Sequence, residues 1–533
     1  MKVKTLFLIL FVSLCLLLTS CSKDSKEIYV INYGAAENVS GSMFYLHCYN
    51  KNYLVDCGQF YNDVVDNVTY EERKKAAVKE NDDFPFNVES IDAVILTHAH
   101  LDHIGRVSLL VNKGYKNKIY CTRGTALLLE VILKEQIRYS DAVRNWTFSR
   151  KSIKTGKEGN EYVIGHFTDC WWSRKISNEN RYSSKNRRTE LEDRDNISIS
   201  PCKDCAESEL REIMLLIKEV DFNQAIELDK GVTFNLSETG HLPGSSSVLI
   251  NVNNDNTQKK LLFSGDLGNS MSIFQEGPHP PISADYVWVE NTYGGIIRDS
   301  NIKNEYSTFI EDIKTVLEGG GIVWIPAFAL DRTQKVLALL KQAQSQGTIS
   351  DNIKIFLTSP TAEKFNDLYE NGLLNKDKFK YGNTFPKVID KYPDSLNKPH
   401  ILITTSGMMD MAASKTLLKR LLPNKKVHIF IVGYQDPDSP GGQLKQGNTK
   451  LFLDDKEIVS NATIHNYKVF SSHPDAKEIS YWLSNQNKTT AKIILIHGGK
   501  QQLASQKEFL ANLGYTNIII PKRNDKIMID HLN

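Results

Sequence analysis

The sequence predicts an α/β protein in which strands alternate with helices around one histidine-rich loop. Two observations carry this prediction. Residues 91–105 read IDAVILTHAHLDHIG, where a short apolar run that suits a buried strand leads into a cluster of polar side chains. Between about residues 300 and 434, helix-like and strand-like segments alternate, which is typical of a mostly parallel sheet with both faces covered.

The histidine-rich loop holds four candidate metal ligands. His98 and His100 are two residues apart, so a helix would point them to nearly opposite sides, whereas an extended segment points alternate residues the same way. His98 and His100 can then reach one ion while Asp102 and His103 reach a second. Three imidazoles and a carboxylate at such close spacing suit Zn²⁺ or a similar borderline metal.

Length and composition describe an ordinary soluble protein. The chain has 533 residues, which is enough for two or three domains with a large core. Hydrophobic residues make up 41% and charged residues 24% of the sequence, as in globular proteins generally. The net charge is only +2, so any RNA or DNA site must be a local patch and not a global field.

Residues 1–20 have the pattern of a secretory signal peptide. Lys2 and Lys4 precede an apolar run at 6–18, and small residues follow before Cys21. The run is shorter than the ~20 residues that a membrane-spanning helix needs, although an uncleaved anchor is the alternative. The Leu-x-Ser-Cys ending resembles the bacterial lipobox. That resemblance implies lipidation of Cys21 and a membrane-anchored lipoprotein that faces outside the cytoplasm, in the bacterial cell envelope.

Residues 141–204 interrupt the strand and helix pattern with a basic segment rich in aromatic residues. Such a segment can bind single-stranded nucleic acid through phosphates and base stacking, or it can be a solvated loop with its aromatics packed on the domain. It also contains His166, Cys170, Cys202 and Cys205, whose spacing suits a small structural zinc site. A disulfide is equally consistent with an exported chain, and both interpretations stay open.

Later segments supply further candidate ligands. His241 lies in a Gly-His-Leu-Pro-Gly-Ser turn, which leaves its side chain free to face an ion. Asp266 follows a predicted strand at 260–264, and its two carboxylate oxygens can each hold one ion of a two-metal site ~3.5–4 Å across. His497 follows a predicted strand at 493–496.

Together these segments resemble the motifs of the metallo-β-lactamase-fold hydrolases, whose signature is HxHxDH. The resemblance implies an αββα sandwich that binds two zinc ions, with Asp56 hydrogen-bonded to the metal loop without being a ligand. The implied ligands form two groups of three joined by one bridging carboxylate: His98, His100 and His241; Asp102, His103 and His497; and Asp266.

Other segments resemble the β-CASP branch of that family, which includes RNA-processing nucleases. The segments ENTYG (290–294), PAFALDR (326–332), SPTA (359–362) and FSSHPD (470–475) resemble its motifs E-[S/N]-T-Y-G, PAFALGR, SPLA and FSAHxD. Asp331 stands where PAFALGR has glycine. Gly499 stands where the family's VHGE pattern has glutamate, which puts one contact near His497 in doubt.

The branch implies a second α/β domain inserted into the hydrolase fold. The expected organisation is a signal peptide (1–20), the first part of the metallo-β-lactamase domain (27–298), the β-CASP domain (299–435), and a C-terminal part with RNA-specificity motifs (436–533). The segment 141–204 is an extra insertion in the first part.

The resemblance implies a zinc-dependent phosphodiesterase acting on RNA or single-stranded nucleic acid. His473 would be the general acid that protonates the leaving oxygen, Glu290 would keep it protonated, and Asp102 would take part as a ligand. The alternative is an exported metallohydrolase for another ester, phosphodiester or amide, because RNA processing is a cytoplasmic task and fold alone does not choose the substrate. A third structural zinc and a homodimer are further possibilities that stay open.

Overall fold

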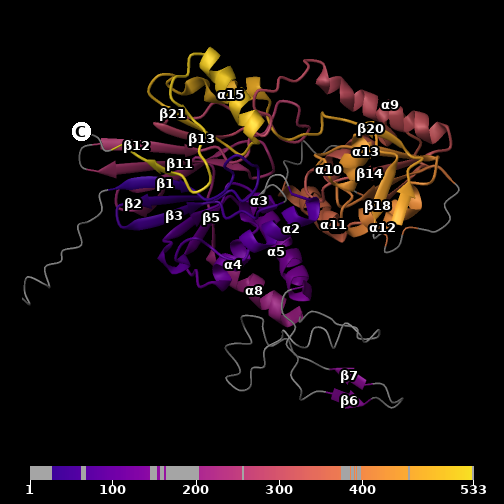
Figure 1. The fold of residues 1–533 in the computed structure, drawn as a ribbon, viewed down its shortest axis with the longest axis horizontal. Coiled ribbons are helices and arrows are strands. Elements are labelled where there is room, and N and C mark those ends of the chain that lie inside the picture. The colour runs from indigo at the N-terminus through magenta and orange to yellow at the C-terminus, as the bar shows by residue number, and fades with distance from the viewer. Residues whose placement is uncertain are drawn as a thin grey trace, which may run out of the picture.

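A computed structural model shows a chain built around three large sheets (Figure 1). The structure describes residues 27–61, 68–143, 153–155, 161–163, 203–254, 257–373, 385, 389, 392, 398–453 and 456–530. In Figure 1 the indigo N-terminal and yellow C-terminal segments lie together, and the orange segment forms a separate part beside them. The chain therefore leaves its first domain, builds a second one and returns.

The first sheet has seven strands. In order across the sheet they are β23 (Lys526–Met528), β1 (Ile28–Asn32), β2 (Phe44–Cys48), β3 (Lys51–Val55), β4 (Ala93–Ile95), β5 (Lys118–Cys121) and β8 (Ile217–Glu219). Residues of β1 and β2 alternate between buried and partly buried, as expected when one face of a strand covers the core. The strand predicted before the histidine-rich loop is shorter than expected, because only β4 pairs with both neighbours.

The second sheet also has seven strands and packs face to face on the first. Its order is β22 (Ile518–Ile519), β21 (Lys492–Ile496), β13 (Tyr286–Glu290), β12 (Thr257–Phe263), β11 (Ser246–Asn254), β10 (Val232–Glu238) and β9 (Ile226–Asp229). One apolar core joins the sheets, for example through Phe44 of β2 and Phe263 of β12, whose ring centroids are 5.6 Å apart. Burial of this shared face is the main force that holds the sandwich together.

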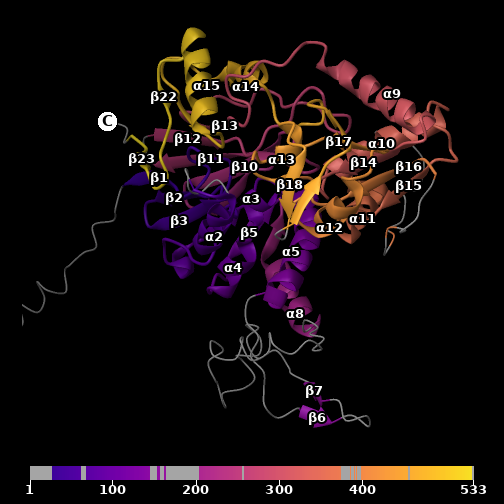
Figure 2. The same cartoon turned by 45° about the vertical axis from the view of Figure 1, so that its right-hand side comes forward.

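Helices cover the two outer faces of this sandwich. Apolar residues of α4, α5 and α8 pack on the first sheet, and those of α14 and α15 pack on the second, as Figure 2 also shows for the yellow helices. The helices of this part are α2 (Tyr70–Glu80), α3 (Leu101–Ile104), α4 (Val107–Asn112), α5 (Arg123–Val143), α8 (Lys203–Leu216), α14 (Ala476–Trp482) and α15 (Lys500–Asn512), with short 3-10 turns at Val88–Ser90 and Leu483–Asn485. The predicted αββα sandwich is therefore confirmed.

The third sheet has five strands, and its paired strands all run in parallel. Its order is β15 (Lys354–Leu357), β16 (His400–Thr404), β14 (Ile322–Pro326), β17 (Val427–Ile431) and β20 (Thr463–Asn466). Most positions of β14, β16 and β17 are buried, as in a sheet covered on both faces. The predicted domain end at residue 435 falls before β20, which pairs with β17.

Helices flank this sheet on both sides, so it has the α/β architecture that the sequence predicts. Apolar residues of α9 and α10 pack on one face, and those of α12 and α13 pack on the other. The elements are α9 (Glu305–Glu318), α10 (Arg332–Ser345), α11 (Pro360–Leu368), α12 (Ala412–Leu421) and α13 (Pro440–Lys445), a 3-10 turn at Ile302–Asn304, a π turn at Tyr369–Leu373, and a hairpin of β18 (Lys450–Leu453) and β19 (Lys456–Val459).

An apolar cluster joins the two domains beside the histidine-rich loop. Leu128 of α5 and Leu242 belong to the first domain, and Leu330, Phe365 and Tyr369 belong to the second. Because all of them are buried, the second domain is seated directly against the end of the sandwich where the histidines lie.

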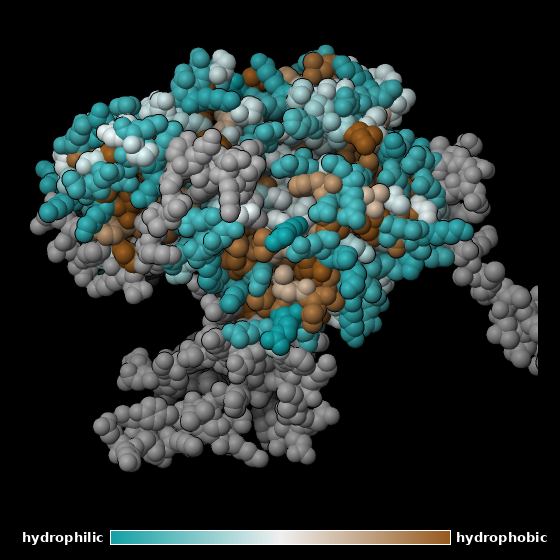
Figure 3. Space-filling view, turned by 180° about the vertical axis from the view of Figure 1, so that it is seen from behind, coloured by the Kyte–Doolittle hydropathy of each residue, from teal (hydrophilic) through white to brown (hydrophobic). Residues whose placement is uncertain are grey.

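The surface seen from behind is largely hydrophilic, with hydrophobic side chains gathered near the middle of that face (Figure 3). Among the described residues, no helix combines the length and the apolar character that a membrane crossing requires. The short strands β6 (Ile153–Thr155) and β7 (Glu161–Val163) form a hairpin in the predicted insertion.

Candidate active site

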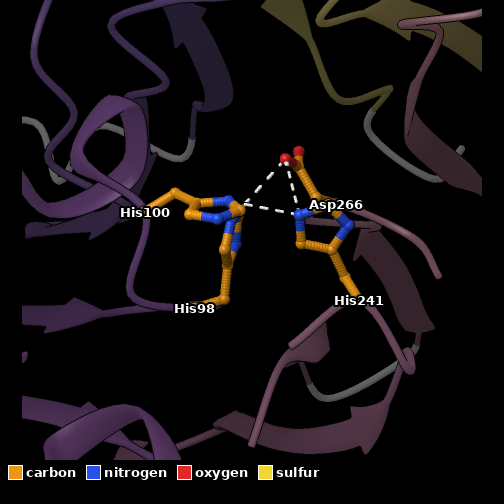
Figure 4. Close-up of side chains that lie close together, drawn as sticks. All are labelled: His98, His100, His241 and Asp266. Carbon is orange, nitrogen blue, oxygen red and sulfur yellow. Dashed lines mark hydrogen bonds and ion pairs between the residues drawn. The ribbon is translucent and has the colours of Figure 1, made fainter. Parts of the chain in front are cut away.

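The predicted metal ligands meet at one end of the sandwich, although they come from distant parts of the chain. Those on the first sheet's side follow β4 or lie on α3, and those on the second sheet's side follow β10, β12 and β21. The structure brings together all of the predicted ligands: His98, His100, Asp102, His103, His241, Asp266 and His497. Figure 4 shows His98 and His100 facing His241 and Asp266 across the join between the two sheets.

The first group of ligands is a cluster of lone pairs. His100 Nδ1 lies 3.2 Å from both His98 Nε2 and His241 Nε2. The Nδ1 atom of His241 lies 3.1 Å from the carbonyl oxygen of Leu267, so the proton of a neutral ring sits there and Nε2 faces the group as an acceptor. Asp266 Oδ2 completes the group, 3.5 Å from His98 Nε2 and 3.6 Å from His241 Nε2. Converging acceptors of this kind fit a cation.

The second group lies on the other side of the same carboxylate. His103 Nε2 is 3.3 Å from His497 Nε2, which is 3.4 Å from Asp102 Oδ2. Asp266 Oδ1 is 3.2 Å from His103 Nε2 and 3.5 Å from His497 Nε2. This buried oxygen has no hydrogen-bond donor of suitable geometry among the described residues. The two oxygens of Asp266 thus face different groups, which is the arrangement that a bridge between two ions requires.

Asp56 holds the loop from behind. It ends β3 with a left-handed backbone (φ 63°), and its Oδ2 accepts hydrogen bonds from Thr97 Oγ1 at 2.8 Å and His103 Nδ1 at 2.7 Å. Its Oδ1 accepts from the backbone N–H of Thr97 at 2.8 Å. These bonds leave Nε2 as the free nitrogen of His103 and fix the direction of its ring, as expected for a residue that orients a ligand without being one.

Burial and the carboxylates divide the histidines into two classes. Burial lowers the pKa of His98 and of His241 well below the usual range, and the charge of a neighbouring histidine adds to this. Burial also acts against protonation of His103 and His497, but Asp266 and a second carboxylate outweigh it. The pKa of His103 is therefore well above the usual range, and that of His497 is raised to about 9. A bound cation would displace protons from both rings.

His473 and Glu290 form a pair beside the ligand groups. His473 Nδ1 lies 3.0 Å from Glu290 Oε1 and 3.2 Å from Oε2, and Glu290 is fully buried at the end of β13. Since Nδ1 donates to this carboxylate, Nε2 is the nitrogen left for proton transfer. His473 Nδ1 is 3.9 Å from Asp266 Oδ2, farther than any ligand nitrogen named above.

Three residues that hold this site were not predicted from the sequence. Asn269 Nδ2 and Arg298 Nη2 donate to the backbone oxygen of His473 at 2.9 and 2.8 Å, and Thr292 Oγ1 lies 3.0 Å from His497 Nδ1. Thr292 lies in the ENTYG segment, which was the available signal, whereas Arg298 follows no motif. Thr292 also supplies a partner for the His497 ring, so its orientation does not depend on position 499.

Some predicted residues lie outside the described part of the chain. Cys21, His166, Cys170 and Cys202 are among them, and Cys205 is described only as a backbone position of α8. The zinc and disulfide interpretations of that cluster therefore stay predictions.

Family models match three consecutive parts of the chain. The metallo-β-lactamase superfamily model matches residues 72–293, the Beta-Casp domain model matches 333–444, and the model for a Zn-dependent metallo-hydrolase RNA specificity domain matches 457–521. This chain has a metallo-β-lactamase fold with an inserted β-CASP domain. The order of the three matches agrees with the two domains and the returning C-terminal segment of the structure.

The β-CASP protein described here is similar over most of its length to three curated proteins. A ribonuclease from Thermus thermophilus is 25% identical, with 91% of this chain and 96% of that protein covered. A transcription termination factor from Methanocaldococcus jannaschii is 23% identical, covering 93% of this chain and 71% of that protein. A probable RNase from the same organism is 24% identical, covering 94% of this chain and all of that protein.

Proposed function

We propose that this protein is a metal-dependent nuclease that cleaves phosphodiester bonds in RNA or single-stranded nucleic acid. The observation that carries the proposal is the pair of ligand groups joined by Asp266, with the His473–Glu290 pair beside them. Two similar proteins are named as ribonucleases, and the model matching residues 457–521 describes an RNA specificity domain. Both facts support nucleic acid as the substrate.

Each residue of the site has a defined task in such a reaction. Zinc ions held by the two ligand groups would supply charge stabilisation at the phosphoryl oxygens and a water of lowered pKa. His473 donates a proton from Nε2 to the leaving oxygen, and Glu290 accepts from Nδ1 and so holds the ring in its donating tautomer. Asp56 and Thr292 hold the rings of His103 and His497, which keeps Nε2 of each ring turned toward Asp266.

Substrate profiling tests this function. The mature protein, purified from residue 22 onward without chelator, is assayed on an RNA oligonucleotide, single-stranded DNA, bis(nitrophenyl) phosphate and a β-lactam. We expect RNA to be turned over with the highest kcat/KM. Turnover of another ester or an amide without cleavage of either nucleic acid would instead identify the exported metallohydrolase of the alternative hypothesis.

We expect the mature protein to contain about two zinc ions per chain at the main site, because two complete ligand groups are present. Elemental analysis of active protein measures this, and prolonged dialysis against a chelator should remove both the zinc and the activity. A third ion would support a structural site at His166, Cys170, Cys202 and Cys205. Active protein with one ion or none would contradict the two-ion site.

We also propose that Cys21 carries a lipid that anchors the protein to a membrane of the bacterial cell envelope. The support is the Leu-x-Ser-Cys ending after a short apolar run. The Cys21→Ser protein should leave the membrane fraction, since lipid and not a spanning helix would hold it there. Fractionation followed by immunoblotting measures this, and a variant that stays in the membrane fraction at unchanged size would refute lipid anchoring.

A further inference from the structure

Two residues at which this chain departs from the β-CASP motifs are in direct contact. Asp331 stands at the glycine position of PAFALGR, and Ser472 stands at the alanine position of FSAHxD. Ser472 Oγ donates to Asp331 Oδ2 at 2.9 Å, although the two residues are 141 positions apart in the chain. The departures therefore form one structural unit and are not two independent changes.

A buried lysine completes this unit. Lys335 lies one turn further along α10, and its Nζ is 2.6 Å from Asp331 Oδ2 and 2.8 Å from Ser472 Oγ. The exposed fractions are 3% for Asp331, 1% for Lys335 and 4% for Ser472. Burial opposes ionisation of Asp331, but the charges of Lys335 and Arg332 outweigh it and lower its pKa. A buried lysine with such a partner stays charged, and without the partner it would lose most of its compensation.

The backbone at Asp331 is held in a conformation that favours glycine. Its φ is +64° and its ψ is −52°, immediately before α10 begins. A non-glycine residue keeps such a conformation only where its surroundings determine it strongly. Here the carboxylate makes contacts that a glycine could not make, which gives a physical reason for an aspartate at a glycine position.

The unit connects the inserted domain to the loop that carries the proposed general acid. Ser472 directly precedes His473, whose backbone oxygen is held by Asn269 and Arg298 and whose ring is held by Glu290. Those three contacts come from the returning sandwich and its adjoining segment. The contact of Ser472 with Asp331 and Lys335 is the one from α10 and the residue before it, so it fixes the same loop from the opposite domain.

We propose that Asp331, paired with Lys335, is a positioning residue that holds the His473 loop against the inserted domain through the hydroxyl of Ser472. The inference rests on the proposed role of His473 as general acid. It extends that role by making the placement of the acid depend on a contact between the two domains. A misplaced acid slows reactions with poor leaving groups and has little effect on reactions with good ones.

The test compares leaving groups in Ser472→Ala, which removes one hydroxyl and leaves the Asp331–Lys335 ion pair intact. A series of aryl phosphodiesters with nitrophenyl, chlorophenyl and phenyl leaving groups is assayed together with an RNA oligonucleotide. We expect turnover of the nitrophenyl ester within about twofold of the wild type, and turnover of the phenyl ester and of RNA about tenfold lower. Asp331→Asn, which also removes the charge that pairs with Lys335, should give the same pattern with a larger loss.

The matched control is Ser414→Ala. Ser414 is a fully buried serine of the same domain whose hydroxyl lies 2.7 Å from Thr404 Oγ1, away from His473. Its loss should lower thermal stability without changing the ratio between leaving groups. Equal losses of Ser472→Ala on all esters, or no loss on any, would overturn the proposal. A wild type that turns over the aryl esters but not RNA would refute the nuclease function, while the leaving-group series would still decide the role of Ser472.

Discussion

We expect His473→Ala to slow the cleavage of RNA by about 10²–10⁴-fold while the metal content stays unchanged, because general acid catalysis typically contributes this much. The ring makes its short contacts to Glu290, at 3.0 and 3.2 Å, and stands farther from Asp266 than the ligand rings do. Its removal therefore takes away a proton donor and leaves both ligand groups complete. Steady-state kinetics on RNA and elemental analysis of the same preparation measure the two parts of this expectation.

A good leaving group separates the proton donor from a ligand. Bis(nitrophenyl) phosphate needs little protonation, so its turnover by His473→Ala should stay close to that of the wild type. Glu290→Gln keeps a hydrogen-bond acceptor for Nδ1 and should cost less on RNA than loss of the whole ring. Equal losses on both substrates, or loss of zinc from His473→Ala, would show that His473 binds metal or has only a structural role.

The sequence predicts the elements of this fold well where a segment reveals its environment locally. The predicted strand at 493–496 and the predicted helix at 332–344 each differ from β21 and α10 by one residue. Strands such as β22 and β23 have only two and three residues, and they exist because they pair with β21 and β1. No local pattern marks such strands, since their identity comes from a partner far away in the chain.

The ligands of the site were predictable for a different reason. Histidine and aspartate at fixed spacing after a strand have few other uses, so the histidine-rich loop and the turn at His241 stand out in the sequence. Arg298 and Asn269 act through backbone oxygens of a loop some two hundred residues later. Such contacts depend on how two distant segments pack, and an arginine or asparagine in a loop gives no indication of them.

Position 331 shows the same limit in a single residue. The sequence identifies Asp331 as a departure from a glycine motif, and it identifies neither Lys335 nor Ser472 as its partners. The structure explains the departure by a buried ion pair and a hydrogen bond across the domain boundary. A motif comparison therefore located the unusual residue, and only the packing of α10 against the His473 loop gave it a reason.

Asp266→Ala should have the other large effect, with metal content below one ion per chain and RNA turnover at least ~10³-fold lower. Asp266 is the carboxylate whose two oxygens face both ligand groups, with contacts of 3.2–3.6 Å to rings on each side. Charge stabilisation by bound metals is worth several kcal/mol, and each ~1.4 kcal/mol lost is a factor of ten in rate. Elemental analysis and kinetics of the purified variant measure both effects.

Asp102→Ala is the matched control, because it removes a carboxylate from one group only. Asp102 Oδ2 contacts His497 Nε2 at 3.4 Å and takes no part in the group formed by His98, His100 and His241. That variant should keep about one ion per chain, held by the intact group, and Asp266→Ala should keep fewer. If Asp266→Ala instead binds as much zinc as Asp102→Ala or the wild type, the carboxylate does not join the two groups, and the two-ion arrangement fails on its central residue.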